Sequence, residues 1–232
     1  MKKIGIIGAM ELEVAALKEK MNVTGITKKA SMEFYEGTLN NTAVVIVKSG
    51  IAKVNAAVCA QILADVFAVT HIINTGVAGS LDAKINIGDI VVSTNVCHHD
   101  VDATVFGYQL GEVPQMGGLA FEADKQMVTL AKSSCEEVNP DIRVFTGRIV
   151  SGDQFICDKA VKDKIVTNFA GLCTEMEGAA IAQTASLNNI PFVIIRAISD
   201  KADNSAEMDY PSFELEAAKH SAKLVEHFIA QL

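Results

Sequence analysis

The chain lacks long hydrophobic runs and any pairing pattern among its cysteines. Apolar runs such as GIIGAM and AVVIV are far too short to span a bilayer, and the short apolar stretch before Glu11 is unlike a signal peptide. The five cysteines are scattered along the sequence and form no CxxC pair; they are Cys59, Cys97, Cys135, Cys157 and Cys173. This pattern favours a reducing cytoplasm over a disulfide framework or a zinc site.

Clusters of basic residues are also lacking. The sequence has 28 acidic and 20 basic residues, which gives a net charge of -8. Without a basic patch, we expect neither nucleic acid nor an anionic membrane as a partner. Half of the residues are hydrophobic, which is enough for a sizeable core. The expected partner is therefore a small molecule.

Strand and helix patterns alternate along the chain. We expect strands at 4–8, 34–39, 43–48, 71–75, 89–93, 143–150 and 193–198, and helices at 11–20, 51–67, 122–138, 159–168, 178–187 and 211–232. The second and third strands form a hairpin about Asn40 and Asn41. This order predicts an α/β fold, a three-layer α/β/α sandwich with a central mixed sheet. No linker or repeat interrupts it, so we expect residues 1–232 to form a single domain.

The least regular stretch runs from residue 100 to residue 119. It is rich in glycine and carries Phe106, Tyr108, Pro114 and Met116. Apolar side chains on a long loop indicate a lid or an interface.

The run PFVIIRAISD, residues 191–200, ends an apolar strand in the polar pair Ser199 and Asp200. In an open α/β sheet, ligands bind at the carboxyl ends of such strands. Burial there would raise the pKa of Asp200 and let it hold a proton, as a general acid must. The structural alternative is a helix N-cap, and this run alone does not separate the two interpretations.

Three further segments follow strands: GAMELE (8–13), NTGVAGS (74–80) and SGDQFI (151–156). Another segment, TEMEG (174–178), joins a short strand to a helix. We expect them to meet RAISD at one edge of the sheet. Glu11 and Glu13 lie at a helix N-terminus, where they would repel phosphate, so GAMELE is not a dinucleotide fingerprint. The negative charges of both residues interact favourably with the helix dipole. Glu13 is also a candidate base, because its side chain could point into the cleft.

The other segments also carry candidate binding residues. Gly76 and Gly79 either let backbone N–H groups approach a ligand or form a tight turn. Glu175 and Glu177 share a face in an extended chain, and either could accept ribose hydroxyls or stabilise a helix start. The ring of Phe155 could stack on a base or anchor a loop.

Two other site types are not expected. His98, His99, Asp100 and Asp102 suggest a metal, but adjacent histidines point apart and no distant residue has ligand spacing. The sequence has no GxSxG motif, which argues against a serine hydrolase.

The predicted cleft is rich in carboxylates, namely Glu13, Glu175, Glu177 and Asp200. Such a cleft suits a cationic transition state, as in glycoside cleavage, where one carboxyl protonates the leaving group and another activates water.

The sequence resembles the 5′-methylthioadenosine/S-adenosylhomocysteine nucleosidase family, within the superfamily of purine nucleoside and uridine phosphorylases. The similar blocks are, in order, GIIGAMELE, KSGIAKVNAA, NTGVAGS, GDIVVS, HHDVDATVFGY, SGDQFI, EMEGAAIA and RAISDKAD, and they span essentially the whole chain. The resemblance implies hydrolysis of the N-glycosidic bond of 5′-methylthioadenosine and S-adenosylhomocysteine, and of 5′-deoxyadenosine, without a cofactor. It also implies a place in methionine salvage and amino-acid biosynthesis.

The resemblance also implies residue roles. Glu13 matches the base that activates water, and Asp200 matches the acid that protonates adenine N7, with Ser199 beside it. Glu177 matches the carboxylate that holds the ribose hydroxyls, with Met176 against the sugar.

Other positions match the family's substrate pocket. Phe155 and the backbone of Ile156 match the adenine contacts, and Met10, Ile51 and Tyr210 match the lining of the 5′-thio pocket. The matched pocket also includes Val77, Gly79 and Glu175. Phe106 and Pro114 match residues that a second subunit contributes, which implies a homodimer. Many family members have Ser where this chain has Val77, which puts a contact to the catalytic aspartate in doubt.

Alternatives remain open at this stage. A phosphorylase would need several arginines around phosphate, and Arg143, Arg148 and Arg196 all lie outside GAMELE, KSGIAK and NTGVAGS. Water is therefore the expected nucleophile. A nucleoside-binding protein on the same fold would not need both Glu13 and Asp200. A nucleosidase acting on 6-amino-6-deoxyfutalosine is compatible with the sequence, because that substrate shares the adenosine half.

Overall fold

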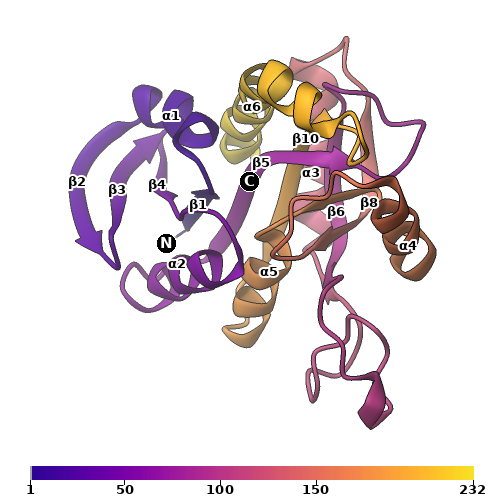
Figure 1. Cartoon of the computed structure of the whole chain (residues 1–232). Helices are drawn as coiled ribbons and strands as arrows, with labels where there is room; N and C mark the ends of the chain where they lie inside the picture. Colours follow the sequence, from indigo (N-terminus) through magenta and orange to yellow (C-terminus); the bar gives the residue numbers. More distant parts are fainter. Residues whose placement is uncertain (1) are drawn as a thin grey trace.

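The computed structural model describes residues 2–232, without the side chain of Met208. Its strands form one mixed sheet with helices on both faces (Figure 1). The strands are β1 (Lys3–Gly8), β2 (Asn22–Lys29), β3 (Met32–Leu39), β4 (Thr42–Lys48), β5 (His71–Ser80), β6 (Ile90–His98), β7 (Phe121–Glu122), β8 (Val144–Ser151), β9 (Cys173–Glu175) and β10 (Phe192–Asp200). The helices are α1 (Glu11–Lys20), α2 (Lys53–Asp65), α3 (Lys125–Val138), α4 (Lys159–Phe169), α5 (Gly178–Leu187) and α6 (Ala206–Gln231), with a 3-10 turn at Thr104–Phe106.

The sheet has the strand order β10-β6-β8-β9-β5-β1-β4-β3-β2, and β7 pairs with β6. β10 pairs both with β6, antiparallel, and with β5, parallel, so that β10, β6, β8, β9 and β5 close into a ring. β1, β5 and β10 are parallel neighbours, and their carboxyl ends therefore meet at one edge. This edge is where ligands bind in open α/β sheets.

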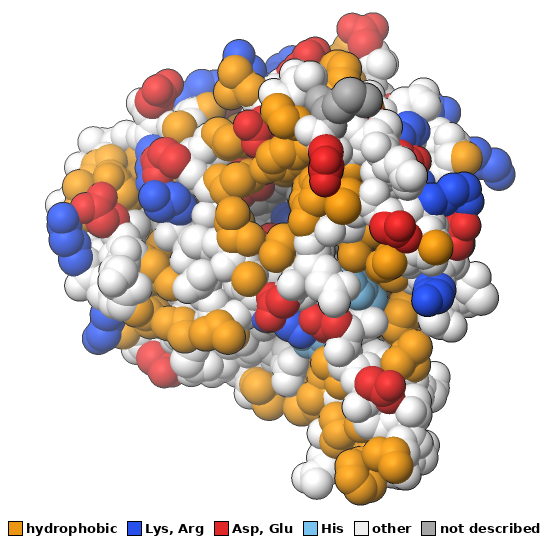
Figure 2. Space-filling model, in the orientation of Figure 1, with side chains coloured by type: hydrophobic (Ala, Val, Ile, Leu, Met, Phe, Trp, Pro, Cys, Tyr) orange, Lys and Arg blue, Asp and Glu red, His pale blue; other side chains and the backbone are white. Residues whose placement is uncertain are grey.

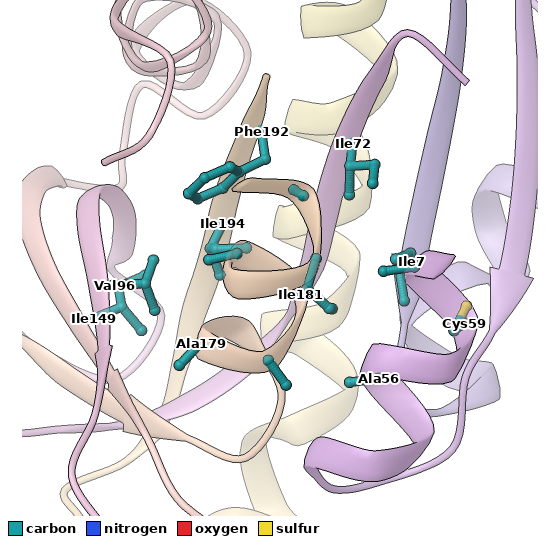
Figure 3. Close-up of a cluster of buried hydrophobic side chains, with 14 of the residues drawn as sticks. Ile7, Ala56, Cys59, Ile72, Val96, Ile149, Ala179, Ile181, Phe192 and Ile194 are labelled. Carbon is teal, nitrogen blue, oxygen red and sulfur yellow. The ribbon is translucent and has the colours of Figure 1, made fainter. Parts of the chain in front are cut away.

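Helices cover the sheet on two sides. α2 and α5 pack on each other against one face, where Ile7, Cys59, Ile181 and Ile194 belong to one buried cluster (Figure 3). α1 and α3 each pack on α6 on the opposite face, around a second buried cluster. The predicted α/β fold with a mixed sheet between helices is confirmed. The closure of five strands into a ring was not predicted, because it depends on β10 pairing on both of its edges.

Several element bounds differ from the predicted ones for physical reasons. The strand predicted at 71–75 continues through NTGVAGS to Ser80, because Gly76 and Gly79 lie inside β5 and form no turn. β2 was missed because most of its residues are exposed and it lacks an apolar alternation. α6 begins at Ala206, so Pro211 lies within the helix instead of starting it.

The segment from residue 100 to residue 119 is irregular, as predicted, and projects from the body of the molecule (Figure 1). Hydrophobic side chains cover the tip of this projection (Figure 2). Val105 and Phe106 are 84% and 79% exposed. Among the described residues, no helix is both long enough and apolar enough to cross a membrane.

Candidate active site

A cavity of about 400 Å³ lies at the carboxyl ends of β1, β5, β9 and β10. Figure 2 shows it as a hollow with a hydrophobic rim and acidic side chains inside. Its lining comprises Ala9, Met10, Glu13, Ile51, Val77, Ala78, Gly79, Gln154, Phe155, Ile156, Thr174, Glu175, Met176, Glu177, Ser199, Asp200 and Tyr210. The structure thus brings together every predicted site residue except Gly76, Phe106 and Pro114. Ala9, Ala78, Gln154 and Thr174 are lining residues that the sequence did not reveal.

Glu13 lies in the first turn of α1 and is buried. Its Oε2 accepts hydrogen bonds from the N–H groups of Ala9 (2.6 Å) and Met10 (2.9 Å), and its Oε1 accepts one from Val77 (3.1 Å). Burial raises the pKa of Glu13, while the Arg196 guanidinium and these N–H groups oppose that shift. The carboxyl group lines the cavity, and the effect of burial on its pKa outweighs that of these neighbours.

Asp200 is the last residue of β10 and only 2% exposed. Its Oδ1 accepts a hydrogen bond from the N–H of Ala202 (2.7 Å), and its Oδ2 accepts one from the Ser199 hydroxyl (2.9 Å). Burial raises its pKa, and the negative charges of Asp209 and Asp203 add to that shift although both hydrogen bonds oppose it. Asp200 does not serve as the N-cap of α6, which is Ser205.

The glycines of β5 let these two carboxyl groups approach the sheet. A Cβ atom on Gly76 would lie 2.5 Å from Glu13 Oε1, and one on Gly79 would lie 2.7 Å from Asp200 Oδ1. Val77, between them, is 9% exposed and lines the cavity. The close approach explains why small residues interrupt an otherwise apolar strand.

The two glutamates of TEMEG have different surroundings. Glu175 accepts hydrogen bonds from Arg196, Ser151 and the N–H groups of Glu177 (3.1 Å) and Gly178 (2.8 Å), so its carboxylate is fully engaged. The Oε1 of Glu177 accepts one from the N–H of Ala52 (2.7 Å). Burial and the adjacent Glu175 raise the pKa of Glu177. Of the two, Glu177 has the greater capacity for further hydrogen bonds to a ligand.

Arg196 is a site residue that sequence reasoning missed. It lies in β10 and is 1% exposed, and its guanidinium contacts Glu175, Asn74 and, at 3.9 Å, Glu177. Its position inside an apolar strand was a signal, because a buried arginine requires carboxylate partners. Arg196 compensates the negative charge of the carboxylates beneath the cavity.

Apolar and aromatic side chains form the outer wall. The rings of Phe155 and Tyr210 pack edge to face with centroids 5.6 Å apart, and the Tyr210 hydroxyl lies 3.3 Å from the Met10 sulfur. Phe155 is 48% exposed and lines the cavity, so part of its side chain is open to a ligand. Ile51 is 49% exposed and also lines this side.

Phe106 and Pro114 lie outside the cavity, on the exposed projecting segment. A single chain therefore does not bring them to the site.

The histidine cluster predicted not to bind a metal has other contacts. His98 Nε2 lies 3.0 Å from Gln183 Oε1, and the ring of His99 packs on Gly152. Within residues 2–232, no three His, Cys, Asp or Glu side chains are grouped as metal ligands.

Comparisons with known proteins match the entire fold. The family model described as "Phosphorylase superfamily" matches residues 3–230. The 5′-methylthioadenosine/S-adenosylhomocysteine nucleosidase of Staphylococcus carnosus is 45% identical over 99% of this chain and 100% of its own length.

Solved structures agree with this match. The nucleosidase of Neisseria meningitidis in complex with methylthio-immucillin-A has a TM-score of 0.96 and 40% identity, and the match covers 100% of both chains. That of Colwellia psychrerythraea in complex with adenine has a TM-score of 0.96 and 43% identity, over 100% of this chain and 96% of that one. The chain belongs to the 5′-methylthioadenosine/S-adenosylhomocysteine nucleosidase family of the phosphorylase superfamily.

Proposed function

We propose that this protein hydrolyses the N-glycosidic bond of 5′-methylthioadenosine and S-adenosylhomocysteine, releasing adenine and the 5-substituted ribose. The observation that carries the proposal is a pair of buried carboxyl groups that face one cavity from different elements, Glu13 on α1 and Asp200 at the end of β10. Burial raises the pKa of both groups; Arg196 opposes that shift at Glu13, whereas Asp203 and Asp209 add to it at Asp200. Two carboxyl groups in one cleft suit an acid and a base that act on one glycosidic bond.

Asp200 is the proposed general acid. Breaking the bond to N9 pushes negative charge into the purine ring, and a proton delivered to N7 neutralises that charge. The carboxyl of Asp200 gives up this proton and becomes a carboxylate. Ser199, whose hydroxyl donates to Asp200, would orient the acid in place of the hydroxyl that Val77 lacks.

Glu13 is the proposed general base. It takes a proton from the attacking water as the ribosyl ring becomes cationic, and the nearby carboxylates stabilise that cation. Backbone N–H groups hold both carboxylate oxygens of Glu13, which fixes their direction.

The remaining lining residues suit the other parts of the substrate. Glu177 would accept hydrogen bonds from the ribose hydroxyls, with Met176 against the sugar. Phe155, the backbone of Ile156 and Ser199 would contact adenine, as expected from the resemblance. The proposed pocket for the 5′ substituent is lined by Met10, Ile51 and Tyr210.

Water suits this site better than phosphate does. No lysine or arginine is among the described residues that line the cavity. Arg196 is engaged by Glu175 and Asn74 behind the lining, and Arg143 and Arg148 pair elsewhere, with Asp89 and Asn95. A phosphate nucleophile would meet carboxylates instead of cations.

The futalosine alternative is not favoured, because relatives about 45% identical over the full length are named for methylthioadenosine and S-adenosylhomocysteine. 5′-Deoxyadenosine is a further proposed substrate, since an apolar pocket accepts its methyl group. We also propose a cytoplasmic location and a role in methionine salvage. All five cysteines are free thiols, as in a reducing compartment.

A homodimer is proposed in addition. The projecting segment exposes Val105 and Phe106, and a second copy would bury them. Phe106 and Pro114 of one subunit would then complete the partner's pocket around the thio substituent.

Adenine release in phosphate-free buffer tests the proposed function. Wild-type protein should liberate adenine and methylthioribose, and added phosphate should neither accelerate the reaction nor yield a ribose 1-phosphate. Glu13→Gln keeps the shape but removes the base, so turnover should fall by about 10²-fold or more. A strict requirement for phosphate would overturn the hydrolase assignment, and near-normal turnover in Glu13→Gln would remove Glu13 from the mechanism.

A further inference from the structure

The backbone at Ala52, immediately before α2, adopts a conformation that normally requires glycine. Its φ is 81° and its ψ is 165°. For a residue with a Cβ atom this region is sterically unfavourable, and it persists only where surrounding contacts enforce it. Ala52 also provides no side-chain cap for the helix. Contacts around Ala52 must therefore hold this conformation.

The strained residue contacts the proposed ribose carboxylate directly. The N–H of Ala52 donates to Glu177 Oε1 at 2.7 Å, although the two residues are 125 positions apart in the sequence. Ile51, which lines the cavity, lies just before it. The conformation at Ala52 therefore sets the position of the N–H that holds Glu177.

Three charged side chains next to Ala52 form an ionic clamp, here defined as Lys53, Asp100 and Asp153. The Lys53 ammonium donates to both carboxylate oxygens of Asp100, at 2.7 and 2.8 Å. The N–H of Lys53 donates to Asp153 Oδ1 (2.8 Å), and the N–H of Asp153 donates to Asp100 Oδ2 (2.9 Å). The clamp thus joins the start of α2 to the loops that follow β6 and β8.

The clamp has the properties of an ordered ion pair. The side chains of Lys53 and Asp100 are only 20% and 18% exposed. Burial works to raise the pKa of Asp100, but the contacts with Lys53 and Asp153 bring it below its ordinary value. Several hydrogen bonds in one network make such a pair stronger than an isolated surface pair.

We propose that Lys53, Asp100 and Asp153 are positioning residues that hold Ala52 in its strained conformation and thereby fix Glu177 for the ribose hydroxyls. This inference rests on the proposed function, because it assigns Glu177 to the ribose. Asp100 also begins the segment that carries Phe106 and Pro114, so the same clamp links that segment to the ribose end of the cavity.

The test compares two substrates, methylthioadenosine and its 2′,3′-dideoxy analogue, which lacks the hydroxyls that Glu177 would bind. Lys53→Met should raise the KM for methylthioadenosine by roughly tenfold, the usual effect of losing one hydrogen bond to a charged group. Its kcat should change less. For the dideoxy analogue, the KM of wild type and variant should be equal.

Relief of the strain gives a second, independent measurement. In the Lys53→Met protein, Ala52→Gly should return the KM for methylthioadenosine toward the wild-type value, because glycine adopts this backbone conformation without the clamp. Lys3→Met is the matched control, since Lys3 forms a similarly half-buried ion pair with Glu36. It should leave both KM values unchanged. Asp153→Ala, which removes the acceptor of the Lys53 N–H, provides a second variant should Lys53→Met fold poorly.

The outcomes separate the clamp from the proposed function. If wild-type protein releases no adenine, the function fails, whatever the variants do. If wild type is active but Lys53→Met and Asp153→Ala keep its KM, or raise KM equally for both substrates, the clamp does not act through Glu177. A defect that Ala52→Gly does not relieve would also overturn the proposal.

Discussion

At the scale of single residues, two buried carboxyl groups with raised pKa values have different proposed roles, Asp200 as the acid and Glu13 as the base. The acid function requires protonated Asp200, so the rate should fall as the pH rises through its pKa. Ionised Glu13 is needed as well, so the rate should also fall as the pH drops through the raised pKa of Glu13. A bell-shaped profile of kcat/KM is the expected result.

The alkaline side of that profile should respond to Asp209. Its negative charge helps to raise the pKa of Asp200. Asp209→Asn should therefore lower this pKa and move the alkaline limb to lower pH, with the acid limb unchanged. Asp65→Asn, an exposed acid at the end of α2, is the control. An alkaline limb that stays in place in Asp209→Asn would mean that another group sets it.

Replacing the acid itself should separate catalysis from stability. Asp200→Asn can donate a hydrogen bond to N7 but cannot transfer a proton, so kcat should fall by about 10²–10⁴ with KM little changed. The raised pKa means that the folded protein loses stability as the pH rises above the ordinary value of 3.8 through the folded-state value. Asparagine does not ionise, so the variant does not lose stability in this way. Its Tm should therefore exceed that of wild type at neutral pH. A normal kcat in this variant would mean that Asp200 has only a structural role.

At the scale of elements, β5 carries the site because its glycines leave room for side chains from α1 and β10. Gly76→Ala would place a methyl group against Glu13, and Gly79→Ala would place one against Asp200 and Ala202. A shift of the reacting groups by about 1 Å can cost on the order of 10² in rate. We expect this loss of kcat in each variant, with a modest fall in Tm. Gly25→Ala, in open space on β2, should change neither, and equal activity of all three would contradict the close approach.

Much of the element pattern was predictable, and the exceptions have local causes. Strands such as β1 and β10 could be predicted from the sequence because residues on both of their faces are buried and apolar. β5 was predicted too short because its second half is glycine-rich, and the need for glycine comes from Glu13 and Asp200, which approach from other elements. The start of α2 was predicted too early because the sequence around Ala52 does not indicate the unusual backbone conformation of this residue.

At the scale of the whole molecule, the projecting segment predicts an assembly. Phe106→Ala should raise the KM for methylthioadenosine more than that for adenosine, because in the proposed dimer only methylthioadenosine presents a thio substituent to Phe106 of the second copy. Light scattering should give the mass of a dimer at assay concentration. A fully active monomer would contradict the shared pocket. Val166→Ala, which trims a half-exposed residue on α4, serves as the control.

The site as a whole could be predicted in part from the sequence. Carboxylates and glycines that follow strands could be assigned to one edge, because parallel strands share an edge. The roles of Arg196, Ser151 and the ionic clamp could not be predicted from the sequence. Their contacts join residues that lie between 21 and 122 positions apart. Such contacts are decided by tertiary packing, which local patterns do not encode.

The double pairing of β5 has a consequence for synthesis of the chain. On one edge, β1 emerges from the ribosome before β5, whereas β10, which pairs along most of the other edge, emerges more than a hundred residues later. During that interval one edge of an apolar, glycine-containing strand is without its final partner, and such edges invite pairing with other chains. Nascent chains stalled before residue 192 should therefore depend on chaperones, and they should lack activity altogether, because Asp200 and Tyr210 have not yet been made.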